Sequence, residues 1–248
     1  MPGHVPIMSA PYPHPMFGGS TILGGGFDGS TTYITRGADL TGASDGGNLT
    51  LAFRIRLADD TTFYEIMNSN GNILRISKHD SVDWIQFIIK NTSSSDVVNT
   101  ESAINSIKAD GSYHNVLFSV KLAATATSHI YIDDSSSVNS PTLTEGGVMD
   151  LTRGDWAVGA TIAGGSKFSG DINFFYYDDV YYDFSVESNR RKFFDASGDP
   201  VLDPTGDGTP SGGVQPLIYL AGTFNQWENN KGTGGGMTVT GALSEPAD

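Results

Sequence analysis

The chain has 248 residues, and 28 Asp and Glu against 14 Lys and Arg give it a formal net charge of −14. This charge argues against nucleic acid and anionic membrane surfaces as partners, because both are bound through clusters of Lys and Arg. The absence of cysteine excludes disulfides, thiol nucleophiles and thiolate metal sites. The sequence has no apolar run of about 18 residues and no basic segment followed by an apolar stretch at its start, so we expect neither a transmembrane helix nor a secretory signal.

Glycine accounts for 31 residues and charged residues for only 17% of the chain. Segments rich in aromatic and β-branched residues alternate with clusters of Gly, Ser, Asn and Asp. Many short strands joined by such turns are typical of a sandwich or barrel, so the composition predicts an all-β protein.

The first 19 residues hold five of the eleven prolines, which excludes helix and interior strand and favours an extended conformation. This segment also carries a row of apolar side chains: Val5, Ile7, Met8, Tyr12, Met16 and Phe17. We expect an assembly arm that packs on its own domain or on a neighbouring subunit of a homo-oligomer, with a trimer preferred. The alternative is a mobile tail.

The rest of the chain predicts one strand after another. In the longest amphipathic segment, Leu51, Phe53 and Ile55 alternate with Arg54 and Arg56, which places the apolar residues in the core and the arginines outside. Strands are predicted over 49–57, 63–67, 73–77, 82–90, 113–122, 129–133, 156–160, 172–182, 216–220 and 237–240.

One short helix is predicted over 186–194, with Ser185 as its cap. Glu187 lies near its positive end, and three basic residues follow toward its negative end, as the helix dipole favours.

The order of these segments resembles a laminin-G-like domain of the concanavalin A-like lectin/glucanase superfamily. Residues 113–118 are Tyr-His-Asn-Val-Leu-Phe, at the place where that family usually has Trp-His-x-Val. Residues 130–134 are Ile-Tyr-Ile-Asp-Asp, at the place where the family has a Tyr-Val-Asp-Gly turn. The other matching pieces are 27–34, 49–56, 156–160, 168–172 and the Asp-Phe-Ser of 183–185. The resemblance implies a jelly-roll sandwich of two antiparallel sheets.

On this basis we divide the chain into three parts. Residues 1–19 form the proline-rich arm, 20–195 the laminin-G-like jelly roll, and 196–248 a turn-rich C-terminal extension that packs on the sandwich or on a neighbour.

The C-terminal segment resembles the ending of laminin-G-like virion proteins of tailed bacteriophages. The matching runs are Arg-Arg-Lys-Phe at 190–193, Asp-Pro-Thr-Gly-Asp-Gly-Thr-Pro at 203–210 and Gly-Gly-Gly-Met-Thr-Val-Thr-Gly-Ala-Leu at 234–243. This resemblance implies a virion structural protein, either a head decoration protein or a tail or fibre subunit. It would be made in the host cytoplasm and would bind itself and other virion proteins.

The glutamates argue against catalysis. Glucanases of this superfamily carry two glutamates a few residues apart on one strand, because retaining hydrolysis needs carboxyl groups about 5–5.5 Å apart. The six glutamates here are never within five residues of one another, and the histidines are scattered without the spacing of a zinc site. We therefore expect no enzyme and no catalytic residues.

Two kinds of ligand remain open. Some laminin-G domains bind calcium at a sandwich rim, where Asp28, Asp133 and Asp134 are the candidates, and turn-forming aspartate is the alternative interpretation. No other cofactor is expected.

Glycan binding is the second expectation that the superfamily implies, and it gives the alternative function, a carbohydrate-binding module recognising host surface glycan. Sugar sites combine aromatic faces with amide and carboxylate groups. Trp84 with Gln86 fits this combination, as do Tyr177, Asp179 and Tyr181 along the aromatic strand. Packing in the core or between subunits is the alternative role for these aromatic residues.

Overall fold

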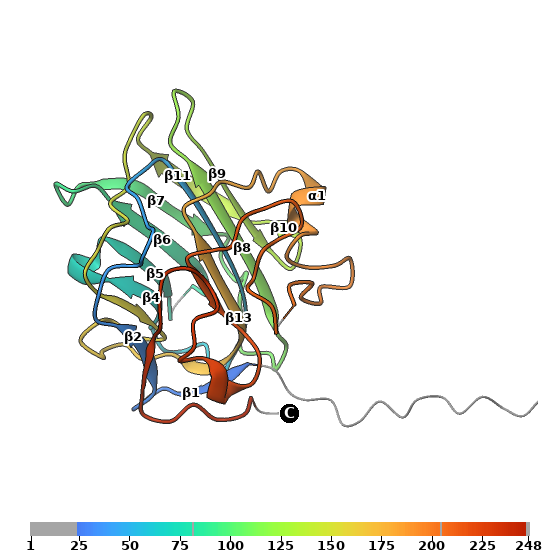
Figure 1. Ribbon diagram of the computed structural model, residues 1–248. Coiled ribbons are helices and arrows are strands. Elements are labelled where there is room, and N and C mark those ends of the chain that lie inside the picture. The colour runs from blue at the N-terminus through green and yellow to red at the C-terminus, as the bar shows by residue number, and fades with distance from the viewer. Residues whose placement is uncertain (1–23, 81, 204, 247–248) are drawn as a thin grey trace, which may run out of the picture.

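The computed structural model describes residues 24–80, 82–203 and 205–246. They form two antiparallel sheets packed face to face (Figure 1), which confirms the predicted all-β sandwich. The arm residues Val5 to Phe17 lie outside the described part of the chain. Among the residues described, none of the helices has the length and apolar character needed to cross a membrane.

The seven-stranded sheet has the order β1-β13-β3-β8-β9-β10, with β14 added to β13. Its strands are β1 (Gly25–Asp28), β3 (Asn48–Leu57), β8 (His114–Lys121), β9 (Thr127–Ile132), β10 (Ser135–Ser136), β13 (Ser169–Asp178) and β14 (Ile218–Leu220).

The eight-stranded sheet has the order β11-β7-β6-β5-β4-β12-β2-β15. Its strands are β2 (Tyr33–Arg36), β4 (Tyr64–Ser69), β5 (Leu74–Lys78), β6 (Ile85–Lys90), β7 (Asp96–Ser102), β11 (Val138–Leu143), β12 (Trp156–Val158) and β15 (Thr238–Thr240). The strands β7 and β11 were not predicted.

In residues 24–246, apart from 81 and 204, the helical content is three short pieces, η1 (Asn70–Asn72), α1 (Glu187–Arg190) and η2 (Phe224–Gln226). The helix α1 has only four residues, fewer than predicted, and Val186 precedes it without a side-chain cap. Ser185 is not the cap, because its hydroxyl donates instead to the Asp183 carboxylate at 2.6 Å.

The main core fills the space between the sheets and follows the predicted alternation. Leu51, Phe53 and Ile55 of β3 have no exposed surface. Phe87 of one sheet stacks on Phe118 of the other, with ring centroids 4.1 Å apart, so the aromatic rings join the two layers directly.

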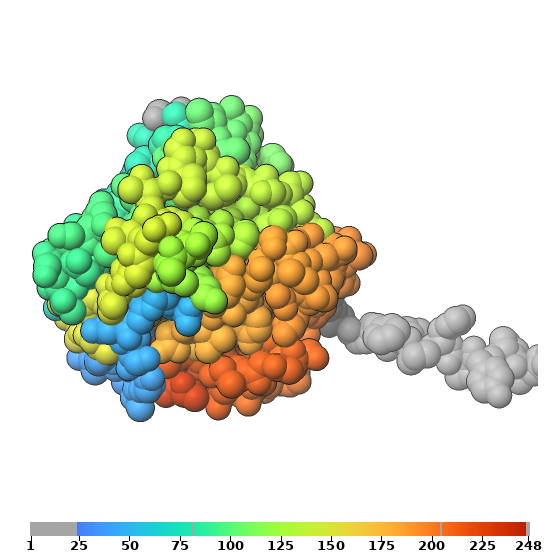
Figure 2. Space-filling model, turned by 90° about the horizontal axis from the view of Figure 1, so that it is seen from above, coloured from blue at the N-terminus to red at the C-terminus, as the bar shows by residue number. Residues whose placement is uncertain are grey.

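A third layer covers the outer side of the seven-stranded sheet. It is built by residues 180–203 and 205–217, and Figure 2 shows an orange surface from this part of the chain beside the green surface of earlier residues. The apolar residues that the layer and the sheet bury together are Ala52, Leu117, Phe174, Tyr176, Tyr182, Phe184, Phe193, Phe194, Leu202, Tyr219 and Ala221.

This layer changes the environment predicted for the β3 arginines. Both point away from the main core as expected, but their side chains are only 22% exposed for Arg54 and 15% for Arg56. Arg56 donates two hydrogen bonds to Asp171, at 2.7 and 3.0 Å. The outer face of β3 is therefore a half-buried boundary and not a solvated one.

The C-terminal extension belongs to the sandwich itself. β14 pairs with β13 in one sheet, and β15 pairs with β2 in the other. The hydroxyl of Thr32 donates to the carbonyl of Ala242, 210 residues further along the chain. A boundary at residue 195 therefore does not separate the jelly roll from the C-terminal segment.

Gly170 occupies a position that only glycine tolerates. Its φ is +138°, and a Cβ at this point would lie 2.1 Å from the Arg56 carbonyl oxygen. We expect Gly170→Ala to lower the free energy of unfolding by about 2–3 kcal/mol, measured by urea denaturation. Gly111 is the control, because it also has positive φ but has open space around it, so Gly111→Ala should cost only about 1 kcal/mol. Equal losses would contradict the steric explanation.

Candidate functional site

The eight-stranded sheet presents two rows of mainly polar residues on its outer face. Strand register sets the first row, because each residue lies opposite the next across β4, β5, β6, β7 and β11. This row is Glu65, Ser77, Gln86, Glu101 and Asn139. The neighbouring row is Asn68, Arg75, Ile88, Asn99 and Thr142. We call these two rows the polar sheet face.

Gln86 is the centre of the polar sheet face. Its Oε1 lies 3.4 Å from Nη2 of Arg75 and 3.2 Å from Nε2 of His79, and its Nε2 donates to Oδ1 of Asn99 at 3.2 Å. Further along the row, Asn139 donates to Glu101 at 3.1 Å. These side chains are half-buried, so their orientations are fixed in advance while their edges remain accessible.

Three aromatic rings close one end of this face. The ring of His79 meets Trp84 edge to face at 5.7 Å, and it meets Phe63 in the same way at 5.1 Å. The guanidinium of Arg75 lies 5.8 Å from the centre of the Phe63 ring. All three rings are partly exposed. The structure therefore brings Trp84 and Gln86 to one cluster, with His79 between them.

Burial shifts two titratable groups of this cluster, Glu65 and His79, toward their neutral forms. Glu65 is only 3% exposed, and this burial raises its pKa to about 7 although Arg75 lies 3.5 Å from its carboxylate. Burial also lowers the pKa of His79. The amides, the imidazole and the aromatic rings here suit a neutral polar ligand better than an ion.

The second predicted set of sugar-binding residues does not form a site. Tyr177 has no exposed surface, because its ring lies in the core 5.4 Å from Trp156. Asp179 accepts hydrogen bonds from the backbone and hydroxyl of Ser44. Tyr181 lies beyond the end of β13, with its hydroxyl 3.2 Å from His129. The prediction that Tyr177 faces a ligand is wrong, because the sandwich buries that side of β13.

The three aspartates proposed for calcium have separate structural roles. Asp28 accepts hydrogen bonds from the backbone amides of residues 30, 31 and 32. Asp133 pairs with His114 at 2.8 Å, and Asp134 pairs with two arginines of the α1 region. In the described part of the chain, no group of three or more potential ligands is placed to hold a metal ion. The structure therefore does not bring these three aspartates together at one site.

Two glutamates share the polar sheet face, but their spacing does not suit glycoside hydrolysis. Glu65 of β4 and Glu101 of β7 lie in one row, three strand spacings apart. That separation is about 14 Å between backbones, and glycosidases hold their carboxyl pairs within about 10 Å.

Comparison with known proteins gives the fold only. No family model matches the sequence, and no curated protein matches it. The heptameric SAP-like pentraxin from Limulus polyphemus is similar in structure, with a TM-score of 0.53, 14% identity and coverage of 89% of this chain and 95% of that one.

A candidate carbohydrate-binding protein from Bacteroides ovatus has a TM-score of 0.51 and 13% identity, over 80% of this chain and 51% of that one. This chain thus spans about half the length of that protein. Domains LG4-5 of the mouse laminin α1 chain match with a TM-score of 0.45 and 12% identity, over 67% of this chain and 44% of that one. The chain is a jelly roll of this lectin-like type, and its chemistry has to be argued from its own residues.

Proposed function

We propose that this protein is a carbohydrate-binding module that holds a neutral glycan on the polar sheet face. One observation carries the proposal: a row of amide, guanidinium and carboxylate groups, hydrogen-bonded to one another, crosses the sheet and ends at partly exposed aromatic rings. Sugar hydroxyls both donate and accept hydrogen bonds, and the apolar faces of sugar rings pack on aromatic side chains. The face offers both kinds of contact together.

The length of the row also suits a chain of sugar units. It spans four strand spacings from β4 to β11, which is about 19 Å. Because the side chains are held by one another, little conformational entropy is lost when a ligand binds. The likeness in fold to a candidate carbohydrate-binding protein fits this function better than the virion role expected from the C-terminal segment.

The decisive variant is Gln86→Leu, which keeps the size of the side chain but removes its hydrogen bonds to three neighbours. We expect the wild-type protein to bind members of an array of plant, bacterial and animal polysaccharides. The variant should lose about tenfold or more in affinity, because one or two buried polar groups are left unpaired in the complex. Titration calorimetry on the best array ligand measures this loss.

Lys90→Gln provides the matched control. Lys90 lies on the same strand and is half-exposed, and its ion pair with Asp96 is long, at 3.9 Å. The affinity of this variant should change by less than about twofold. Failure to bind any polysaccharide, or equal affinity in the Gln86 variant, would overturn the proposal.

A further inference from the structure

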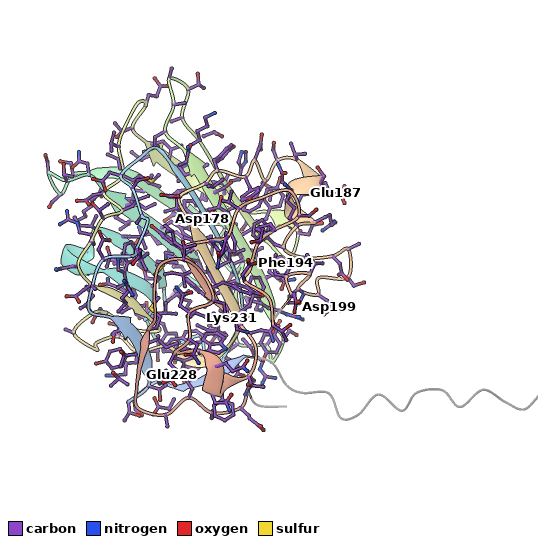
Figure 3. The ribbon with its side chains drawn as sticks, viewed as in Figure 1. Asp178, Glu187, Phe194, Asp199, Glu228 and Lys231 are labelled. Carbon is purple, nitrogen blue, oxygen red and sulfur yellow. The ribbon has the colours of Figure 1, made fainter. Side chains whose placement is uncertain are left out.

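A separate pocket lies on the opposite side of the molecule, on the outer face of the seven-stranded sheet. Its volume is about 280 Å³. Strands β3, β8 and β9 form its floor, and the turn between β9 and β10 and the segment from α1 to Gly198 form its walls. Figure 3 marks Phe194, which lies in this segment and lines the pocket. The volume corresponds to about nine water molecules, the size of one ring-shaped ligand.

Paired groups hold the walls in place. Asp134 accepts hydrogen bonds from Nε of Arg190 and Nη2 of Arg191, each at 2.6 Å. The side-chain nitrogen of Asn115 donates to the Gly198 carbonyl at 2.7 Å, which ties the loop after α1 to β8. The walls of the pocket are therefore preformed, as those of small-molecule sites usually are.

The charges around the pocket cancel. Three lining arginines, Arg54, Arg190 and Arg191, stand against three lining aspartates, Asp133, Asp134 and Asp195. Arg190 lies 4.3 Å from the centre of the Tyr131 ring, and Arg54 lies 5.1 Å from that of Tyr113. Each guanidinium group therefore covers one face of an aromatic ring, and the charged and amide groups leave hydrogen bonds as the main contacts that the pocket offers a ligand.

The floor contains one donor and one acceptor that lack partners. Arg54 and Asn115 lie directly opposite each other in the β3–β8 ladder. Nε of Arg54 and Oδ1 of Asn115 are buried, and neither has a hydrogen-bond partner among the described residues. Asn115 is 8% exposed. An unpaired buried polar group costs free energy. A ligand that pairs with both atoms therefore gains more binding free energy than two ordinary hydrogen bonds provide.

We propose that this pocket binds a single neutral sugar unit through two neighbouring hydroxyl groups. Binding turns the Arg54 and Asn115 side chains so that these two atoms, which are buried in the free protein, meet the ligand. Nε of Arg54 then donates to one hydroxyl, and Oδ1 of Asn115 accepts from the next. A neutral polyol fits the cancelled charges, whereas a phosphate or sulfate would gain no net attraction from three arginines and three aspartates. This site is independent of the polar sheet face, because it lies on the other sheet and uses no residue of that face.

The experiment is a titration of the full chain with methyl glycosides of mannose, galactose and glucose, followed by ¹⁵N-resolved NMR of the Arg54 Nε–H and Asn115 side-chain amide signals. We expect saturable shifts of both signals with at least one sugar. Ala196→Trp should abolish them, because this exposed loop residue lines the pocket and the indole fills it without breaking the wall contacts. Val201→Trp is the control, since Val201 is 44% exposed on the same segment but does not line the pocket.

A second variant removes the donor and keeps the charge. Arg54→Lys should weaken the same sugar by about tenfold, and Gln86→Leu should leave these shifts unchanged, so failure at one site is distinguishable from failure at the other. No saturable shift with any of the three sugars would overturn the proposal. So would shifts that survive Ala196→Trp, or stronger shifts with inorganic sulfate than with sugar.

Discussion

Replacing Phe53 with Ala is expected to lower the free energy of unfolding by about 3–5 kcal/mol. Phe53 lies in β3, near the middle of the seven-stranded sheet, has no exposed surface and stacks on Phe175 with ring centroids 5.6 Å apart. Truncation removes a large buried apolar area and leaves a cavity that the two sheets cannot close without losing register. Guanidinium denaturation with the slope held common to both proteins measures the change.

The neighbouring residue supplies the control. Arg54→Ala removes a half-buried side chain whose ion pair, at 3.3 Å, is with an Asp199 side chain that is 69% exposed. Its loss should cost about 1 kcal/mol. If the two substitutions cost the same, the inward and outward positions of β3 would be assigned incorrectly.

Neutralising Asp178 is expected to stabilise the protein above neutral pH. This carboxylate is 3% exposed at the end of β13 (Figure 3), and burial together with the neighbouring Asp179 raises its pKa to about 7. A pKa raised above the unfolded value means that the folded state binds the proton more tightly. Stability is then fully present below about pH 4 and is lost progressively as the pH rises to about 7.

The full span of this loss is about 4 kcal/mol, at about 1.4 kcal/mol for each pH unit. At pH 8, Asp178→Asn should therefore unfold at a higher denaturant concentration than the wild type, with a free energy of unfolding larger by about 2–4 kcal/mol. Near pH 4 the variant should show no gain in stability. Glu65→Gln should also be more stable than the wild type at pH 8, because burial raises the pKa of Glu65 to about 7 as well.

An exposed carboxylate provides the comparison. Hydrogen bonds within its own turn lower the pKa of Asp207, so Asp207→Asn should give no gain at pH 8. Denaturation curves at several pH values between 4 and 8 test the three variants together. A pH-independent difference between Asp178→Asn and the wild type would contradict this account of the buried acid.

The strands that the sequence predicts most clearly have a two-residue period and one dominant apolar face. β3 and β6 are of this kind, since Ile85, Phe87 and Ile89 point into the core. β7 was missed because its outer positions hold Asn99 and Glu101, which look like loop residues. β11 was missed because Pro141 interrupts it, as prolines do mainly in edge strands.

The error at Tyr177 has a different cause. In a sheet with one solvated face, one of two alternating aromatic sets faces water. On β13 both sets are buried, because Phe175 and Tyr177 enter the main core while Phe174 and Tyr176 lie beneath the third layer. The residue pattern of a single strand does not show whether a face of that strand is covered by another layer of the protein or by a ligand.

The polar sheet face shows the limit of sequence reasoning about sites. Trp84 and Gln86 were found because they lie on one strand side, two residues apart. His79, Arg75 and Glu65 join them only through the register of three strands, and two of the ladders there are shifted by bulges. A one-residue change in register would send these groups to the other side of the sheet.

The closure of both sheets by the ends of the described chain sets the order in which the protein can fold. β1 completes its pairing only with β13, and β2 finds both its partners, β12 and β15, late in the sequence. A nascent chain that has not yet added β14 and β15 therefore leaves β2 with an open edge and the seven-stranded sheet incomplete. Contacts so distant in sequence make folding slow, and a chain in which these two strands are missing is the form most exposed to pairing with other chains.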